Sequence, residues 1–169
     1  MTAPYDTPAA AARAHEELHA CWQSLRREGR LPSREDIDPA AFKRHLPGVS
    51  LIDVIHGGAR FRYRLAGTAL HGVYGRELTG QSIEGAFGLN AGEYWTAELQ
   101  KAVATGRPSA GVHSLAWRGR PHLSVLWLRL PLARDGRRVD MLMGFDALVG
   151  AGVGSPAAPR QEPSGIRAA

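Results

Sequence analysis

The stretch FRYRLAGTALHGVYGRELTG, residues 61–80, decides the fold of this chain. In its first five residues, Phe61, Tyr63 and Leu65 alternate with two arginines. Alternation with a period of two is typical of a half-buried strand, because successive side chains point to opposite faces. The pattern therefore predicts a strand with Phe61, Tyr63 and Leu65 on its core face and the arginines on the other.

Short helical turns are expected directly after this strand. Thr68 is predicted to cap the first turn, because its hydroxyl can accept a hydrogen bond from a free backbone N–H. Gly75 is predicted to end that helix. Five glycines between residues 68 and 90 favour short turns over one long helix, so the longer helix is expected only over residues 91–105.

The elements on either side complete the order of the fold. A strand over residues 49–55 joins the residue 61 strand through a two-residue Gly-Gly hairpin turn. Asp38-Pro39 predicts the start of a short helix. Three closing strands are expected over 112–117, 123–132 and 139–145. The second is nearly continuously apolar, as in a strand covered on both faces. The order predicts an α+β fold with an antiparallel sheet.

An N-terminal helix is predicted over residues 9–28. Apolar residues recur along it at intervals of three and four, which gives one stripe: Ala11, Ala14, Leu18, Cys21, Trp22 and Leu25. Such a stripe can cover the helix's own domain or join a second copy. Because a small domain need not bury Leu18, Trp22 and Leu25 alone, we expect a homodimer through this helix.

Three segments together resemble a family of short, single-domain bacterial PAS proteins. They are LPSREDIDPAAFKRHLPGVSLIDV, then FRYRLAGTALHGVYGRELTGQSI, then a helix and three strands, and the likeness covers residues 31–148. The most specific part is RYRLAGT followed by GRELTG. The resemblance implies a PAS-like five-stranded antiparallel sheet with short helices on one face and a role in sensing. We expect an N-terminal helix over 1–30, the sensor domain over 31–148 and a disordered tail over 149–169.

A PAS fold places its pocket between the concave sheet face and the helices. The residues expected at a ligand there carry bulky or polar side chains: Tyr63, Arg64, Tyr74, Trp95, His113, Trp127 and Met143. Buried polar tips are costly without partners, so they favour a pocket for a small, partly polar molecule of unknown identity. Tight mutual hydrogen bonding would explain the same residues. Arg64 has Asp53 as a candidate partner; if both are partly buried, losing one costs on the order of 3 kcal/mol or more.

Composition excludes several classes of protein. The chain has 169 residues, of which 44% are hydrophobic, so it can form a real core. No apolar run is long enough to span a bilayer, and no signal peptide is recognisable. With one cysteine, Cys21, these features predict a cytoplasmic protein. Nucleophile-elbow, phosphate-loop and zinc-protease motifs are missing, so we do not expect an enzyme.

Cofactors and partners are less defined. A haem would need an axial histidine, and His71, His113 and His122 stand near the expected pocket, though none in a diagnostic context. Cys21 is too far from the short helices for a cysteine–flavin adduct. The net charge of +5 comes without a nucleic-acid-binding motif. We therefore predict a sensor or adaptor that binds a small molecule and signals through a protein partner. The alternatives are a ligand-free interaction module or, more weakly, a nucleic-acid-associated regulator.

Overall fold

A computed structural model describes residues 7–150 of the chain. The elements, in chain order, are α1 (Pro8–Leu25), η1 (Pro39–Gly48), β1 (Val49–Ile55), η2 (His56–Gly58), β2 (Arg60–Ala66), α2 (Thr68–Tyr74), α3 (Ile83–Thr105), β3 (Ser109–Leu115), η3 (Ala116–Arg118), β4 (Arg120–Leu132) and β5 (Met141–Gly150). Within the described residues, no helix is long and apolar enough to cross a membrane.

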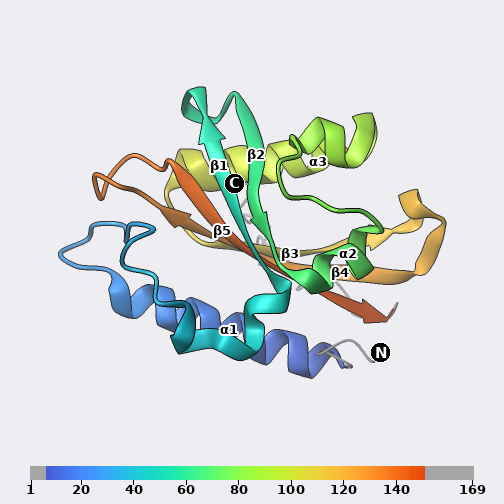
Figure 1. The fold of residues 1–169 in the computed structure, drawn as a ribbon, viewed down its shortest axis with the longest axis horizontal. Helices are drawn as coiled ribbons and strands as arrows, with labels where there is room; N and C mark the ends of the chain where they lie inside the picture. Colours follow the sequence, from blue (N-terminus) through green and yellow to red (C-terminus); the bar gives the residue numbers. More distant parts are fainter. Residues whose placement is uncertain (1–6, 151–169) are drawn as a thin grey trace, which may run out of the picture.

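The five strands form one antiparallel sheet in the order β2-β1-β5-β4-β3. Figure 1 shows α1 on one side of this sheet and α3 on the other. We call the side under α2 and α3 the inner face and the side under α1 and η1 the outer face. The predicted α+β class and five-stranded antiparallel sheet are confirmed. The prediction that β4 is covered on both faces is also confirmed. Val125 and Trp127 belong to the inner core, and Leu128 and Leu130 belong to the outer core.

The β1–β2 hairpin is present, but its turn is longer than predicted. Ile55 pairs with Arg60, so four residues separate the strands. His56, Gly57 and Gly58 all have positive φ angles, of 49°, 68° and 102°. The two glycines adopt this backbone at little steric cost, as expected. The turn extends because η2 adds a 3₁₀ turn between the strands.

The helices differ from prediction at their starts. Gly67, not Thr68, is the N-cap of α2, so no side-chain hydrogen bond caps this helix. Gly75 ends α2 as predicted, in the left-handed region with φ 71°. Element α3 begins at Ile83, with Ser82 Oγ accepting from Gly85 N at 3.0 Å. Gly88, with φ 72°, is not helical and divides α3 into a short first segment and a longer second one, which begins close to the predicted residue 91.

Helix α1 packs on its own domain. Ala11, Ala14, Leu18 and Trp22 are all buried on the outer face of the sheet. The Trp22 indole Nε1 donates to the carbonyl of Pro131 in β4 at 2.8 Å. The homodimer stays a prediction, but Leu18 and Trp22 of the stripe that suggested it are buried within one chain, and Leu25 is partly buried.

The sheet closes with longer strands than expected. β3 begins at Ser109, and β5 runs to Gly150 instead of ending at residue 145. β5 therefore includes the first two residues of the predicted tail. The rest of that tail lies outside the described residues.

Candidate functional site

A buried ion pair lies at the centre of the inner face. Arg129 of β4 donates from Nη1 to Asp146 Oδ1 of β5 at 2.7 Å and from Nη2 to Oδ2 at 3.3 Å. Their side chains are 1% and 0% exposed. Two parallel bonds of this kind fix both position and orientation of the planar guanidinium.

Neighbouring strands position this pair. Gly144 of β5 pairs with Arg129 on one side and with Ser50 of β1 on the other. A Cβ added at Gly144 would overlap Ser50 Oγ and lie 3.1 Å from Arg129 Nη1. The missing side chain therefore makes the space in which the guanidinium lies.

Two indole rings cover the guanidinium. The Arg129 Cζ lies 5.0 Å from the ring centre of Trp95, on α3, and 5.6 Å from that of Trp127, on β4. Burial disfavours the charged form of Arg129, but the Asp146 carboxylate and two nearby tyrosines outweigh it and raise its pKa. The guanidinium thus stays charged inside the protein, paired with Asp146 and faced by aromatic rings.

Tyr63 and Tyr74 complete the surroundings of this pair. Burial raises the pKa of Tyr63. Burial, followed by the Asp146 carboxylate, raises the pKa of Tyr74 well above its usual value. Both phenols therefore keep their protons at neutral pH and can act as hydrogen-bond donors.

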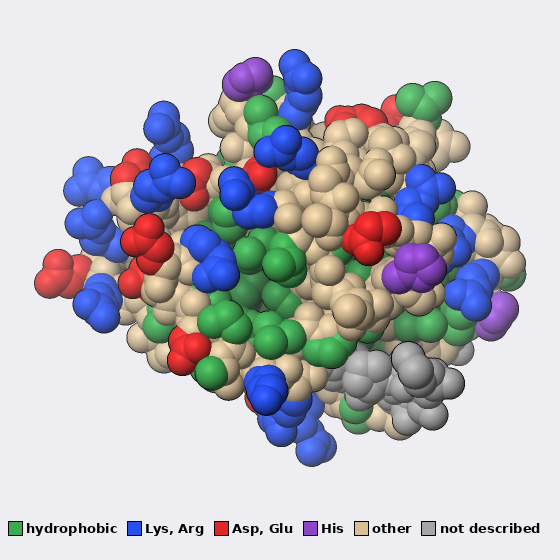
Figure 2. Space-filling view, in the orientation of Figure 1, with side chains coloured by type: hydrophobic (Ala, Val, Ile, Leu, Met, Phe, Trp, Pro, Cys, Tyr) green, Lys and Arg blue, Asp and Glu red, His purple; other side chains and the backbone are tan. Residues whose placement is uncertain are grey.

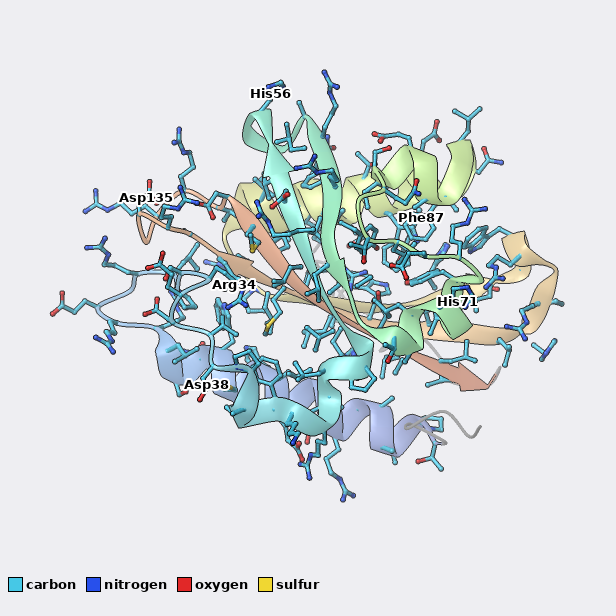
Figure 3. All side chains as sticks on the ribbon, viewed as in Figure 1. Arg34, Asp38, His56, His71, Phe87 and Asp135 are labelled. Atoms are coloured by element: carbon cyan, nitrogen blue, oxygen red, sulfur yellow. The ribbon has the colours of Figure 1, made fainter. Side chains whose placement is uncertain are left out.

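Five of the seven predicted site residues meet on the inner face. The ring of Trp95 lies 6.3 Å from Tyr74, 5.4 Å from His113 and 5.8 Å from Trp127, centre to centre. Phe87 of α3, labelled in Figure 3, connects Tyr74 to Tyr63 at 5.0 and 6.3 Å. The convergence of Tyr63, Tyr74, Trp95, His113 and Trp127 expected from the sequence is thus found, and their rings contact one another.

Met143 and Arg64, expected at the same pocket, lie on the opposite face. Met143 belongs to the outer core because it pairs with Leu51 in a strand whose inner positions are Leu142, Gly144 and Asp146. Arg64 Nε donates to Asp53 Oδ1 at 2.7 Å on the outer side. The pairing of Arg64 with Asp53 is confirmed, but neither Arg64 nor Met143 faces the inner site.

The Arg64–Asp53 pair is weaker than the sequence suggested. The Arg64 side chain is 58% exposed, and Arg62 also reaches Asp53, with Nη2 3.3 Å from Oδ2. Exposed ion pairs contribute about 0–1 kcal/mol. We expect Arg64→Ala to lower the free energy of unfolding by about 1 kcal/mol or less in urea denaturation, and Arg62→Ala, which removes the longer contact, to cost no more than that. A loss of about 3 kcal/mol would contradict this.

Several buried polar atoms around the ion pair have no hydrogen-bond partner among the described residues. They are Arg129 Nε, Trp95 Nε1, Tyr74 Oη, His113 Nε2 and Ser50 Oγ, of which Tyr74 Oη interacts with the Asp146 carboxylate without reaching full hydrogen-bond geometry. The first two can only donate, and both hydroxyls can donate as well. By contrast, Trp127 Nε1 donates to Tyr94 Oη at 3.0 Å, and Tyr94 stacks on His113 at 3.9 Å. We call Arg129, Asp146 and the side chains with these five unpartnered atoms the inner polar cluster; it has an excess of donors.

The sequence prediction missed Arg129, Asp146 and Ser50. The available signal was one charge inside each of two apolar strands, LWLRLPL and MLMGFDALV, with opposite signs. A charge in a strand covered on both faces needs a partner. The neighbouring strand offers one, because it also carries a single charge among apolar residues, and that charge has the opposite sign. The pattern of each strand alone does not show that the two charged residues meet.

The histidines considered for haem lie in different settings. His71 and His122 are exposed, whereas burial lowers the pKa of His113, which is half-buried beside Trp95. Across residues 7–150, no group of three or more His, Cys, Asp or Glu could hold a metal ion. Cys21 lies on α1, across the sheet from the inner polar cluster.

The comparison with protein families agrees with this architecture. The sequence model of one family, described as a PAS domain, matches residues 10–146. The match therefore includes most of α1 as well as the sheet. No curated protein matches the chain.

Proposed function

The chain belongs to the PAS domain family, and on this premise we propose that it is a sensor that binds a small, acceptor-rich molecule at the inner polar cluster. PAS domains act as sensors or interaction modules. The sensor would act in the cytoplasm by binding rather than by catalysis, and would pass its signal to a protein partner. Such a device needs a ligand that binds two conformations with different free energies.

One observation carries the proposal: the excess of unpartnered donors in the inner polar cluster. Leaving a buried donor without an acceptor costs about 1–3 kcal/mol, so buried donors of this kind need an acceptor from a ligand or from water. Because Arg129 Nε and Trp95 Nε1 donate only, the matching molecule carries carboxylate, carbonyl or similar acceptor oxygens. Aromatic walls suit its apolar part.

The second candidate is a ligand-free interaction module. It is favoured by the mutual ring contacts of Tyr74, Trp95, His113 and Trp127, which fill the inner core with protein. The Trp127–Tyr94 hydrogen bond also shows that mutual bonding serves one polar tip. This hydrogen bond leaves the five polar atoms named above without a partner, and for that reason we prefer the sensor.

Tyr74→Phe separates the two candidates. The Tyr74 hydroxyl lies against the Asp146 carboxylate without a full hydrogen bond, so removing it should change the stability of the unliganded protein by about 1 kcal/mol or less. If the hydroxyl serves a ligand, the same change should lower affinity at least about ten-fold. Native mass spectrometry and an absorbance spectrum of freshly purified protein would detect a co-purified molecule. Thermal shift with a panel of small carboxylates and ketones would rank affinities.

Phe61→Leu is the matched control, because Phe61 is an inner-core ring without a polar tip. We expect it to lower stability and leave affinity for any bound compound unchanged. A wild-type protein that retains no molecule and responds to no compound in the panel would support the ligand-free module. So would a Tyr74→Phe protein that binds as tightly as the wild type.

A further inference from the structure

Two adjoining hollows form one groove on the outer face, away from the inner polar cluster. The first has a volume of about 290 Å³ and the second about 520 Å³. They share Arg34, Leu51 and Leu65, so they are continuous. Figure 2 shows this region as a hydrophobic hollow with basic side chains beside it, and Figure 3 places Arg34 between the sheet and the segment that carries η1.

One end of this outer groove is apolar. Besides the shared residues, its lining consists of Ile37, Pro39, Phe42, Leu46, Val49 and Met143. Leu65 is 47% exposed at its edge, although large apolar side chains elsewhere in the described chain are mostly buried. A continuous apolar hollow of this kind is typical of a binding site.

A β-bulge produces this exposure. Leu51 pairs with Leu65 but Ile52 pairs with Tyr63, so Arg64 is an extra residue in β2. The bulge reverses the alternation, and Leu65 lies on the outer face although Phe61 and Tyr63 lie on the inner one. The predicted single face for these three residues is therefore wrong at Leu65, and the reversal adds an apolar wall to the groove.

The other end of the groove is charged and carries more arginines than carboxylates. Arg34, Arg64 and Arg134 line it, against Glu35 and Asp140. Arg64 is paired with Asp53, which Arg62 also contacts. Within residues 7–150, neither Arg34 nor Arg134 forms an ion pair. Arg34 Nη1 donates to the Ile37 carbonyl at 3.4 Å, and the other N–H groups of Arg34 and Arg134 can bind an anion placed beside Leu51 and Leu65.

We propose that the outer groove binds a free single-chain amphiphile with an anionic head, of the fatty-acid class. The chain would lie along the apolar end, where burial of its methylenes drives binding. The carboxylate would lie between Arg34 and Arg134, where guanidinium groups can form charge-assisted hydrogen bonds. The negative head is complementary to the arginines at this end, and the apolar hollow of about 290 Å³ has room for one alkyl chain. This site is independent of the inner polar cluster, because it lies on the opposite face of the sheet.

The test uses the full chain with dodecanoate and dodecyltrimethylammonium, two ligands with the same tail and opposite heads. Isothermal titration calorimetry below the micelle-forming concentrations should show one site, with dodecanoate at least ten-fold tighter. Leu65→Glu should weaken dodecanoate binding at least ten-fold, because it removes apolar contact and repels the carboxylate. Leu89→Glu is the matched control, since Leu89 is 83% exposed on α3, and it should leave binding unchanged.

A second pair of variants tests the head. Arg34→Gln combined with Arg134→Gln should bring the two ligands within about two-fold of each other, whereas Arg137→Gln, an exposed arginine outside the groove lining, should not. Tyr74→Phe should leave dodecanoate binding unchanged, which separates failure here from failure of the inner site. Equal affinity for both amphiphiles, or unchanged binding by Leu65→Glu, would overturn the proposal. So would a wild-type dimer in sedimentation that Leu65→Glu dissociates, because the groove would then join two copies.

Discussion

Asp146→Ala should lower the free energy of unfolding by about 3–5 kcal/mol, the largest loss we expect from a single polar residue. The change would leave the Arg129 guanidinium charged and fully buried without its carboxylate. The two indole rings beside it give partial compensation only. Urea denaturation followed by circular dichroism measures the loss. If the variant is too unstable to purify, the charge-conserving Asp146→Glu provides a milder measure of the same effect.

The double variant Arg129→Met/Asp146→Leu is the control for this prediction. Removing both charges should recover most of the lost stability, because buried pairs often exchange for apolar residues at little net cost. Asp135→Ala, an exposed carboxylate in the β4–β5 turn, should cost much less. Equal losses for Asp146→Ala and Asp135→Ala would show that the inner pair is not energetically important. If the double variant keeps the fold but loses ligand binding, the pair serves recognition.

Trp22→Ala should cost about 3–5 kcal/mol, because it removes a large, fully buried side chain from the outer core. It also leaves the Pro131 carbonyl without the indole donor. Trp117, which is 38% exposed, is the matched control, and Trp117→Ala should cost far less. Thermal unfolding of both variants at the same protein concentration gives the comparison.

Sedimentation of wild type and Trp22→Ala completes this test, because α1 was also predicted to join two copies. Because Leu18 and Trp22 are buried within one chain, Trp22→Ala should destabilise the protein at every concentration. A stability loss that disappears on dilution, together with a dimer in the wild type only, would instead place Trp22 at a contact between copies.

Local patterns in the sequence were sufficient to predict much of the fold. The bounds of β1 match the structure, and Asp38 accepts from Ala40 N at 2.9 Å as the predicted cap of η1. These features depend on a residue and its near neighbours. The inner convergence of Tyr63, Trp95 and Trp127 followed from the topology, because the resemblance supplied the strand and helix order.

The features that were not predicted depend on how the strands pair. The residue pattern of a single strand carries no information about that pairing. The bulge at Arg64 arises from the register of β2 against β1, so the simple alternation placed Leu65 on the wrong face. Met143 alternates correctly in its own strand, yet its face is decided by its pairing with Leu51 of β1. Arg129 and Asp146 become a pair only when β4 and β5 are side by side.

Gly144 should vary together with the Arg129–Asp146 pair among related sequences. A side chain at Gly144 would meet both Ser50 and Arg129, so these two side chains would have to move or be replaced to make room for it. Among related sequences we therefore expect glycine at this position wherever arginine stands at 129 and aspartate at 146. Lineages that lose the charged pair should be the ones in which a larger residue replaces the glycine. The three positions would then change as one unit.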